Sequence, residues 1–181
     1  MNNQTDRAEQ IISAELADWS REKPRRFWDP SRKLLVAIRH YQYWHDRGGI
    51  VSHVMGKFVV LRYFFWSVVT GAEIPLNCNI GGGLLIPHPS GIVIDPGARI
   101  GVNCLIFQQV TIGTRGNPDV PVIEGHVDIG AGAKILGAIR IGAHARVGAN
   151  AVVLSNVPSG AVAVGIPAKI IHERSARDQM S

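Results

Sequence analysis

The hydrophobic positions in the last 110 residues of this 181-residue chain recur with a period of six. Large aliphatic residues follow that interval, with one two-residue slip and one longer break, at Ile74, Ile80, Ile86, Ile94, Ile100, Ile106, Ile112, Ile123, Ile129, Ile135, Ile141, Val147 and Val153. Neither the three-and-four spacing of a helix nor the alternation of a strand matches this interval. A period of six is typical of a solenoid in which each short strand points one aliphatic side chain into a narrow core. We therefore expect a coil of strands over residues 71–171 and a flexible tail over residues 172–181.

Residues 1–70 lack this period and predict a helical segment in front of the coil. We expect a short helix over residues 13–22 and a second helix from an N-cap at Ser31 to about His45. The apolar stretch at residues 50–69 predicts a third helix. We expect it to pack on the open end of the coil, because that end otherwise exposes unpaired strand edges.

Residues 50–69 are also near the length of a membrane span. His53, Lys57 and Arg62 interrupt the stretch, and charges in the middle of a span are costly, so we do not expect it to cross a bilayer. Peripheral contact with a membrane stays open as an alternative, with Lys57 and Arg62 against anionic lipid. The polar first ten residues lack the apolar core of a signal peptide, so the expected location is cytoplasmic, with the inner face of the membrane as the alternative.

Composition narrows the function classes only a little. The chain is 46% hydrophobic and 18% charged, as in an ordinary globular protein. Its formal net charge of +5 comes without a recognised binding motif, so we expect no nucleic acid partner. Cys78 and Cys104 both fall at small turn positions of the repeat, which indicates buried free thiols rather than a disulfide or a zinc cluster.

The chemistry of a solenoid must come from residues that break its repeat. His88 lies between two prolines at the slip, where the repeat favours a small residue. Glu73 precedes it by fifteen positions, so the two side chains are expected to meet at one corner of adjacent coils. A carboxylate beside an imidazole fixes its tautomer and raises its basicity, which is the arrangement of a general base. The alternative is a surface histidine and an unrelated glutamate.

Residues 72–171 resemble the catalytic region of serine acetyltransferases, which are hexapeptide-repeat acyltransferases. The matching stretches are residues 91–94, 108–113, 129–137, 147–153 and 164–169. The resemblance implies a left-handed parallel β-helix of triangular cross-section, with three hexapeptides in each coil. It also implies a homotrimer that uses acetyl-CoA, with a carboxylate–histidine dyad that falls on Glu73 and His88.

The resemblance further implies where acetyl-CoA binds, in a groove between neighbouring subunits. Its contacts, carried over by position, fall on Gly113, Thr114, Ala131, Arg146, Ala149 and Lys169. Small residues let the pantetheine arm lie against the backbone, and the two cations are available for phosphates. Each small residue is also what the repeat itself requires.

The acceptor site departs from that family. Serine acetyltransferases have an aspartate before the catalytic histidine and an Arg-His pair in the loop at residues 113–122. This chain has Pro87, Asp119 and Val120 at those positions, and Asp119 repels a carboxylate. We therefore assign Asp119 and Gln108 to the acceptor site. We expect a saccharide hydroxyl as acceptor, as in the similar enzymes of exopolysaccharide and capsule synthesis.

Three alternatives stay open. The first is O-acetylation of serine for cysteine biosynthesis, with a rebuilt acceptor pocket. The second is a metal enzyme of the γ-carbonic-anhydrase type, since His126 and His144 are eighteen residues apart and should stack. Both lie at turns, and no third histidine completes a zinc triad, so we expect no metal. The third is a non-catalytic trimeric assembly module.

Overall fold

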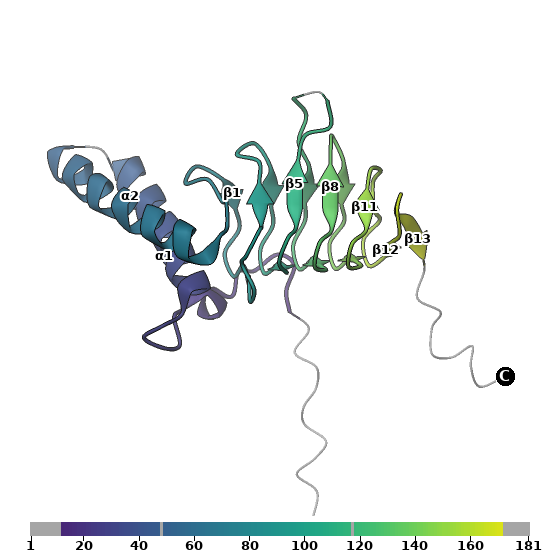
Figure 1. The fold of residues 1–181 in the computed structure, drawn as a ribbon, viewed down its shortest axis with the longest axis horizontal. Helices are drawn as coiled ribbons and strands as arrows, with labels where there is room; N and C mark the ends of the chain where they lie inside the picture. The colour runs from purple at the N-terminus through teal and green to yellow at the C-terminus, as the bar shows by residue number, and fades with distance from the viewer. Residues whose placement is uncertain (1–11, 48, 117, 172–181) are drawn as a thin grey trace, which may run out of the picture.

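The computed structural model describes residues 12–47, 49–116 and 118–171, as a helical part followed by a coil of strands (Figure 1). The helical part comprises a short 3-10 helix (Trp19–Glu22), α1 (Pro30–Arg47) and α2 (Ile50–Thr70). Figure 1 shows the two long helices at one end of the long axis and the strands arranged along it. The two long helices and their position before the coil match the sequence pattern.

Thirteen short strands form the coil in the described residues. They are β1 (Asn79–Ile80), β2 (Val93–Ile94), β3 (Arg99–Ile100), β4 (Leu105–Ile106), β5 (Thr111–Gly113), β6 (Val122–Ile123), β7 (Asp128–Ile129), β8 (Lys134–Leu136), β9 (Arg140–Ile141), β10 (Arg146–Val147), β11 (Val152–Val153), β12 (Val162–Val164) and β13 (Lys169–Ile171).

The strands line three faces of the coil. We call these face A (β2-β5-β8-β11), face B (β1-β3-β6-β9) and face C (β4-β7-β10-β12-β13). Neighbouring strands pair in parallel, except that β13 folds back antiparallel on β12. A chain that visits three faces in turn and returns to the first is a parallel β-helix, which is the architecture that the period of six predicts.

Each coil places its aliphatic side chains in a closed interior. On face A, Ile94 pairs in register with Ile112, and Ile112 with Ile135; their side chains are 2%, 0% and 0% exposed. The slip makes the first coil twenty residues long, since Glu73 pairs with Val93 (93 − 73 = 20). The longer break projects outward as a loop between β5 and β6 (Figure 1). Both irregularities are therefore absorbed at corners, outside the core.

Left-handed backbone conformations recur from coil to coil at two of the three corners. We define the B–C corner by its positive-φ residues Gly83, Asn103, His126, His144 and Gly160. We define the C–A corner by its positive-φ residues Gly71, Gly91, Gln109, Gly132 and Asn150. Glycine adopts this conformation without strain and asparagine with little, which explains their frequency there. The third, or A–B, corner carries the outward loop.

Helix α1 closes the open end of the coil. Leu34, Leu35 and Ile38 are buried in the same cluster as the first aliphatic residues of the coil. Arg39 and Gln42 each donate two hydrogen bonds, between 2.6 and 3.2 Å long, to backbone carbonyl oxygens of the first coil. Those carbonyls lie at the edge of the sheet stack, where unpaired backbone groups are costly. One helix thus supplies both the apolar cover and the missing hydrogen bonds.

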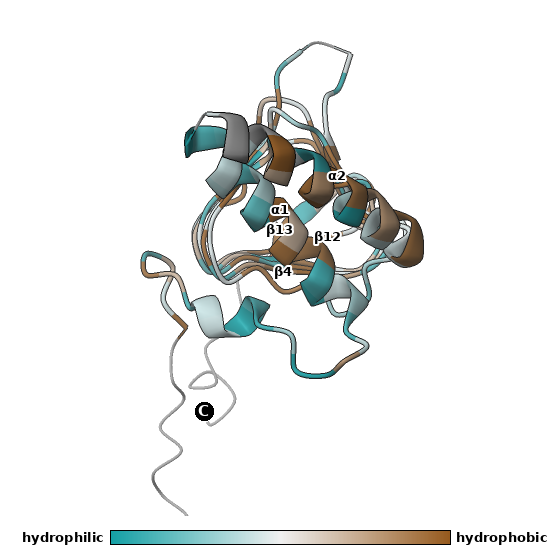
Figure 2. Cartoon of the chain, turned by 90° about the vertical axis from the view of Figure 1, so that its left-hand side faces the viewer, coloured by the Kyte–Doolittle hydropathy of each residue, from teal (hydrophilic) through white to brown (hydrophobic). Residues whose placement is uncertain are grey.

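The expected role of residues 50–69 is therefore only partly correct. Helix α2 does end at Gly71, which has a left-handed φ of 64°, but it packs mainly on α1. It reaches the coil near its C-terminal end, where Trp66 joins the core and the Tyr63 hydroxyl donates to the carbonyl of Ile74 at 3.1 Å. Figure 2, viewed from the helical end, shows apolar residues along much of α2.

The predicted helix over residues 13–22 is wrong apart from the four-residue 3-10 helix at its end. The chain from Ser13 to Asp18 instead runs along the B–C corner. Asn103 holds it there: its amide donates to the carbonyls of Ser13 and Leu16, at 2.7 and 2.8 Å, and its oxygen accepts from the N–H of Asp18 at 2.8 Å. These hydrogen bonds join residues that are far apart in the sequence, so the local pattern of residues 13–22 could not predict them. Pro30, not Ser31, begins α1, as the first helical position allows.

Candidate active site

His88 lies on the exposed side of the C–A corner, in the two-residue slip. The chain reaches it from the buried Ile86 at the end of face C and leaves it towards β2 on face A. Prolines at 87 and 89 restrict the backbone on both sides. The imidazole lies beside the ring of Phe107 on the next coil, with centroids 6.5 Å apart and planes 25° apart. The side chain is thus outside the core and open to an incoming ligand.

Glu73 lies at the start of face A, one coil before Val93. Its backbone N–H donates to Ile92 at 2.8 Å and its carbonyl accepts from Ile94 at 3.0 Å. Burial raises the pKa of the nearby Tyr63 phenol, and the negative charge of Glu73 adds to that rise. Among the described residues no hydrogen bond or ion pair joins Glu73 to His88. The dyad accordingly stays a prediction.

Gln108 occupies the same corner one coil further on. Its backbone carbonyl accepts from the N–H of Gly132 at 2.8 Å, and the neighbouring Gln109 N–H donates to Ser90 at 2.9 Å. The side-chain Oε1 of Gln108 is buried and has no hydrogen-bond partner in the described part of the chain. A buried acceptor of this kind stabilises a donor placed beside it. Gln108 is therefore suited to receive a hydroxyl or ammonium hydrogen at the C–A corner.

The outward loop that carries Asp119 begins at the opposite end of face A. Its base is held on both sides: Val120 lies against Gly97, and Arg115 lies against Gly137, so close that a side-chain carbon at either glycine would be 3.3 Å from them. Asp119 itself is exposed. A hexapeptide of extended chain spans about 20 Å, which separates this loop from the C–A corner within one chain.

The predicted acetyl-CoA contacts divide between the C–A corner with face C and the A–B corner. Ala131 and Ala149 stack at the C–A corner, where the carbonyl of Ala131 accepts from Asn150 N–H at 2.8 Å. Arg146 lines an adjoining groove of about 370 Å³ on face C, floored by Gly130 and Gly148 among others. These small residues leave the backbone accessible to a narrow flexible chain such as pantetheine.

Lys169 is exposed on β13, the last strand of face C. Gly113 and Thr114 lie instead at the A–B corner, where Gly113 ends β5 and its carbonyl accepts from Gly137 N–H at 2.9 Å. One chain therefore groups four of the six predicted contacts on face C and its corner, and places the other two at the far edge of face A.

A cavity of about 570 Å³ opens beside His88. Its lining residues come from the segment before α1, the first turn of α1, the end of α2 and the slip: Arg25, Arg26, Trp28, Asp29, Pro30, Ser31, Arg32, Val69, Thr70, Pro87, His88, Pro89 and Ser90. The contribution of residues 25–32 was not predicted from the sequence. The run of basic residues before Phe27 was the available signal, but no repeat or spacing linked it to the coil.

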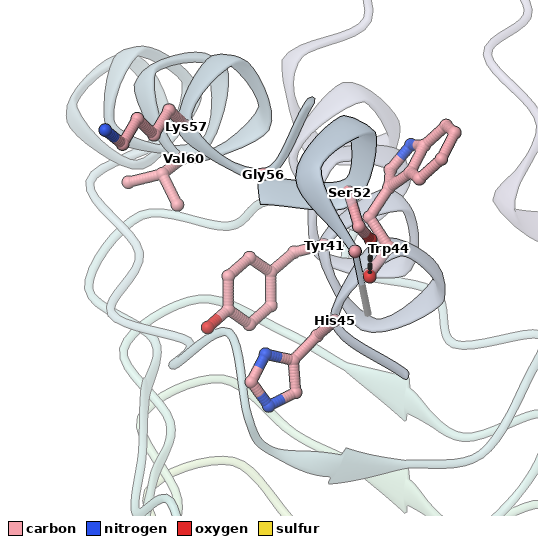
Figure 3. A pocket seen from close by; sticks show the side chains of 8 residues that line it. Tyr41, Trp44, His45, Ser52, Gly56, Lys57 and Val60 are labelled. Atoms are coloured by element: carbon pink, nitrogen blue, oxygen red, sulfur yellow. Dashed lines mark hydrogen bonds between the residues drawn. The ribbon is translucent and has the colours of Figure 1, made fainter. Parts of the chain in front are cut away.

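A second hollow, of about 460 Å³, lies between the end of α1 and the start of α2 (Figure 3). The rings of Tyr41 and His45 stack there with centroids 5.5 Å apart, and the Ser52 hydroxyl donates to the carbonyl of Trp44. None of the residues that the sequence assigned to catalysis, acetyl-CoA or the acceptor lines this hollow, although Lys57 does. It is a feature of the helical hairpin and not of the His88 corner.

The two cysteines are buried free thiols, as predicted. Burial raises the pKa of Cys78 to about 12 and that of Cys104 to about 11, so neither thiol is a nucleophile at neutral pH. His126 and His144 lie one above the other on adjacent coils at the B–C corner, as predicted; their rings meet edge to face at 76°, with their Nδ1 atoms 2.7 Å apart. No group of three His, Cys, Asp or Glu side chains suited to a metal occurs in the described residues.

Comparison with known proteins relates this chain to serine acetyltransferases. The enzyme of Synechococcus elongatus is 42% identical over 113 residues, which are 61% of this chain and 46% of that protein. The Helicobacter pylori enzyme is 46% identical over 106 residues, 57% of this chain and 62% of that protein. No family model matches the chain. This chain thus spans about half the length of the curated relatives that it matches.

Solved structures agree with the sequence comparison. A serine acetyltransferase from Brucella abortus superposes with a TM-score of 0.68 at 31% identity, covering 84% of this chain and 63% of that one. A serine acetyltransferase in complex with CoA gives a TM-score of 0.66 at 32% identity, covering 80% and 58%. The predicted fold class, a left-handed parallel β-helix preceded by helices, is confirmed. The expected exopolysaccharide subgroup finds no support in these relatives.

The His126–His144 pair predicts a loss of stability in mild acid. Partial burial, with smaller contributions from His144 and Arg21, lowers the pKa of His126 in the folded chain. The unfolded chain then takes up a proton at higher pH than the folded chain, so stability falls as pH drops through about 6.5. We expect His126→Asn to flatten the fall in melting temperature between about pH 8 and pH 5, because asparagine tolerates the positive φ.

The control is His40→Asn, an exposed histidine on α1, which should leave the pH dependence of the wild type unchanged. Melting curves followed by circular dichroism give the comparison. An equal pH dependence in wild type and His126→Asn would show that this pair does not contribute.

Proposed function

We propose that this protein is an O-acetyltransferase that moves an acetyl group from acetyl-CoA to an acceptor hydroxyl. The observation that carries the proposal is His88 at an exposed corner, within a β-helix related to serine acetyltransferases. One of those relatives has been solved with CoA. The groove on face C is lined by Gly130, Gly148 and Arg146 together with the carboxylate Asp128; its small residues suit the pantetheine arm, and Arg146 is the candidate partner for a phosphate.

The proposed step is direct attack on the thioester. The His88 imidazole removes the hydroxyl proton as the acceptor oxygen bonds to the acetyl carbonyl carbon. Collapse of the tetrahedral adduct breaks the carbon–sulfur bond, and the His88 imidazolium returns its proton to the departing thiolate to release CoA. Glu73 stabilises the imidazolium through its charge, and backbone N–H groups at the corner stabilise the oxyanion. No hydrogen bond joins Glu73 to His88 in the described residues, so the proposed support of the imidazolium by Glu73 requires the two side chains to approach when ligands bind.

L-Serine is the first candidate acceptor. Every relative described above is named for serine acetylation, and serine acetyltransferase structures have been solved with serine and with cysteine. A saccharide hydroxyl is the second candidate. The observation that favours it is the set Pro87, Asp119 and Val120, which offers no cation to a carboxylate at the family's clamp positions.

We also propose a homotrimer with acetyl-CoA bound between copies. Gly113, Thr114 and Asp119 lie at the A–B corner, whereas His88 and Ala131 lie at the C–A corner. A rotational assembly places the A–B corner of one copy against face C of the next, which unites the two sets. This arrangement explains why the predicted contacts do not converge within one chain.

The apolar face of α2 leads us to propose attachment to an anionic membrane surface. No described helix meets the length and hydropathy needed to span a bilayer. At about 100° per residue, a stripe about 140° wide between Lys57 and Arg62 is free of charge. It contains the exposed side chains of Val54, Phe58, Leu61, Phe65, Val68 and Val69. Cations on both margins, with no acidic residue in α2, repel a second copy of the helix and suit anionic headgroups.

His88→Ala should lower the rate of acetyl transfer by roughly 10²–10⁴-fold, because it removes the proton acceptor. The melting temperature should be unchanged, since the side chain is exposed and outside the core. The assay is thiol release from acetyl-CoA with L-serine and, in parallel, with a panel of neutral sugars. Glu73→Gln, which keeps the size of the side chain, should cost less.

Thiol release that depends on L-serine supports the first acceptor, and release with a sugar alone supports the second. Retention of more than about a tenth of the wild-type rate in His88→Ala would remove this residue from the mechanism. If neither L-serine nor any sugar supports thiol release, the proposed function is contradicted.

For α2, the wild type should sediment with vesicles that contain phosphatidylglycerol and remain in solution with phosphatidylcholine alone. The triple variant Phe58→Gln, Leu61→Gln, Phe65→Gln should lose binding, because burying each side chain contributes about 1.5–3 kcal/mol. The matched control is Ile166→Gln, an equally exposed residue (74%) at the far end of the coil. Failure of the wild type to sediment would contradict membrane attachment. A changed oligomeric mass in the triple variant would show that this face of α2 contacts another subunit instead.

A further inference from the structure

The cavity beside His88 has an excess of positive charge. Three arginines, Arg25, Arg26 and Arg32, line it together with one carboxylate, Asp29. Arg25, Arg26 and Asp29 come from the segment before α1, and Arg32 comes from the first turn of α1. His88 and its neighbours Pro87, Pro89 and Ser90 line the same cavity, so a molecule bound there lies beside the imidazole.

One of the three arginines is already committed. The Arg32 guanidinium donates to Asp29 Oδ2 at 3.2 Å and to the Arg21 carbonyl at 2.9 Å. The Arg25 backbone N–H also donates to Asp29 Oδ2, at 3.0 Å. Although burial raises the pKa of the Asp29 carboxyl, these hydrogen bonds outweigh that effect and hold the pKa below its usual value. Asp29 is thus an ionised carboxylate whose charge is balanced by Arg32, and its hydrogen bonds fix the chain between Arg25 and the start of α1.

The side chains of Arg25 and Arg26 remain. Both are exposed, and neither guanidinium has a hydrogen-bond or ion-pair partner within the described residues. Arg26 precedes Phe27, whose ring is occupied by the Lys33 ammonium 4.7 Å from its centroid. Two exposed arginines that line one cavity suit a planar anion, because each guanidinium presents paired N–H donors that match a carboxylate.

We infer that Arg25 and Arg26 bind the carboxylate of the acceptor and so determine which hydroxyl compound reacts. This assignment rests on the proposed acetyl transfer. It places the carboxylate clamp in the N-terminal segment, on the His88 side of face A, and not in the loop with Asp119. It also favours a hydroxy amino acid such as L-serine over a neutral sugar, and it accounts for the acidic residue at position 119.

A second source of anions competes for the same chemistry. The phosphates of CoA also bind arginine, and a groove for the cofactor is expected nearby. The two sources differ in which ligand is affected when the charges are removed. Loss of a carboxylate site weakens L-serine and leaves acetyl-CoA unchanged, whereas loss of a phosphate site does the reverse.

The test compares L-serine with L-serinamide, which keeps the hydroxyl and the amine but lacks the carboxylate. Binding of each to the full-length protein is measured by calorimetry, with and without CoA, alongside KM values from thiol release. In the double variant Arg25→Gln, Arg26→Gln, binding and KM for L-serine should weaken roughly tenfold to a hundredfold. L-Serinamide and acetyl-CoA should be unaffected. The matched control is Lys23→Gln, which removes a nearby exposed charge outside the cavity.

The outcomes separate the arginine carboxylate site from the proposed acetyl transfer. A wild type that transfers acetyl to L-serine, with a double variant equal to it, overturns the arginine site and leaves the proposed function standing. An effect confined to acetyl-CoA assigns the arginines to phosphate and also overturns the inference. A wild type that neither binds L-serine nor discriminates it from L-serinamide contradicts the inference, and lack of thiol release with any acceptor contradicts the function itself. An equal loss in Lys23→Gln would reduce the effect to general surface charge.

Discussion

The stacking of one aliphatic side chain per hexapeptide is the constraint on which the rest of the structure depends. Isoleucines such as Ile112, Ile129 and Ile135 are 0% exposed and fill the interior from coil to coil. The interior consequently has no room for a ligand, and its backbone groups are engaged with the coils above and below. Everything that binds or reacts must lie on the outer faces, at the corners, or in segments added to the coil. The location of chemistry follows from this exclusion.

The corners differ in what they allow. At the B–C and C–A corners one residue per coil adopts a positive φ, and this favours glycine and asparagine or, at a cost, residues such as His126 and Gln109. The slip adds two residues to the first turn of the C–A corner. That extra length lets the prolines flanking His88 project the imidazole away from the packed backbone. A histidine that breaks the repeat is therefore chemically different from the two histidines that fit it.

Much of the fold could be predicted because it depends on local or periodic signals. The period of six predicted the coil, and Gly71 predicted the end of α2. The small turn positions of the repeat predicted that the two thiols are buried. The predictions that were wrong concern parts of the fold that depend on contacts between distant segments. Asn103 holds residues 13–18 outside any helix, and Arg39, not the more apolar α2, caps the coil because it can bond free carbonyls. Arg25 and Arg26 belong to neither repeat nor helix, so only the structure shows them beside His88.

The division of the candidate site between two corners is the central claim about function. His88 and Ala131 occupy the C–A corner, and Gly113 and Thr114 occupy the A–B corner. If two copies of the chain combine these sets, each site uses His88 from one copy and Thr114 from its neighbour. A charge placed at Thr114 then disables a site without harming the His88 of the same chain.

Subunit mixing tests this claim most directly. His88→Ala and Thr114→Glu, each inactive alone, are co-expressed and assembled together, and thiol release from acetyl-CoA is measured. The account predicts that mixed assemblies recover activity well above either parent, because some sites receive an intact corner from each chain. Activity no higher than that of the separate variants, in assemblies shown to contain both chains, would contradict it and place the whole site within a single chain.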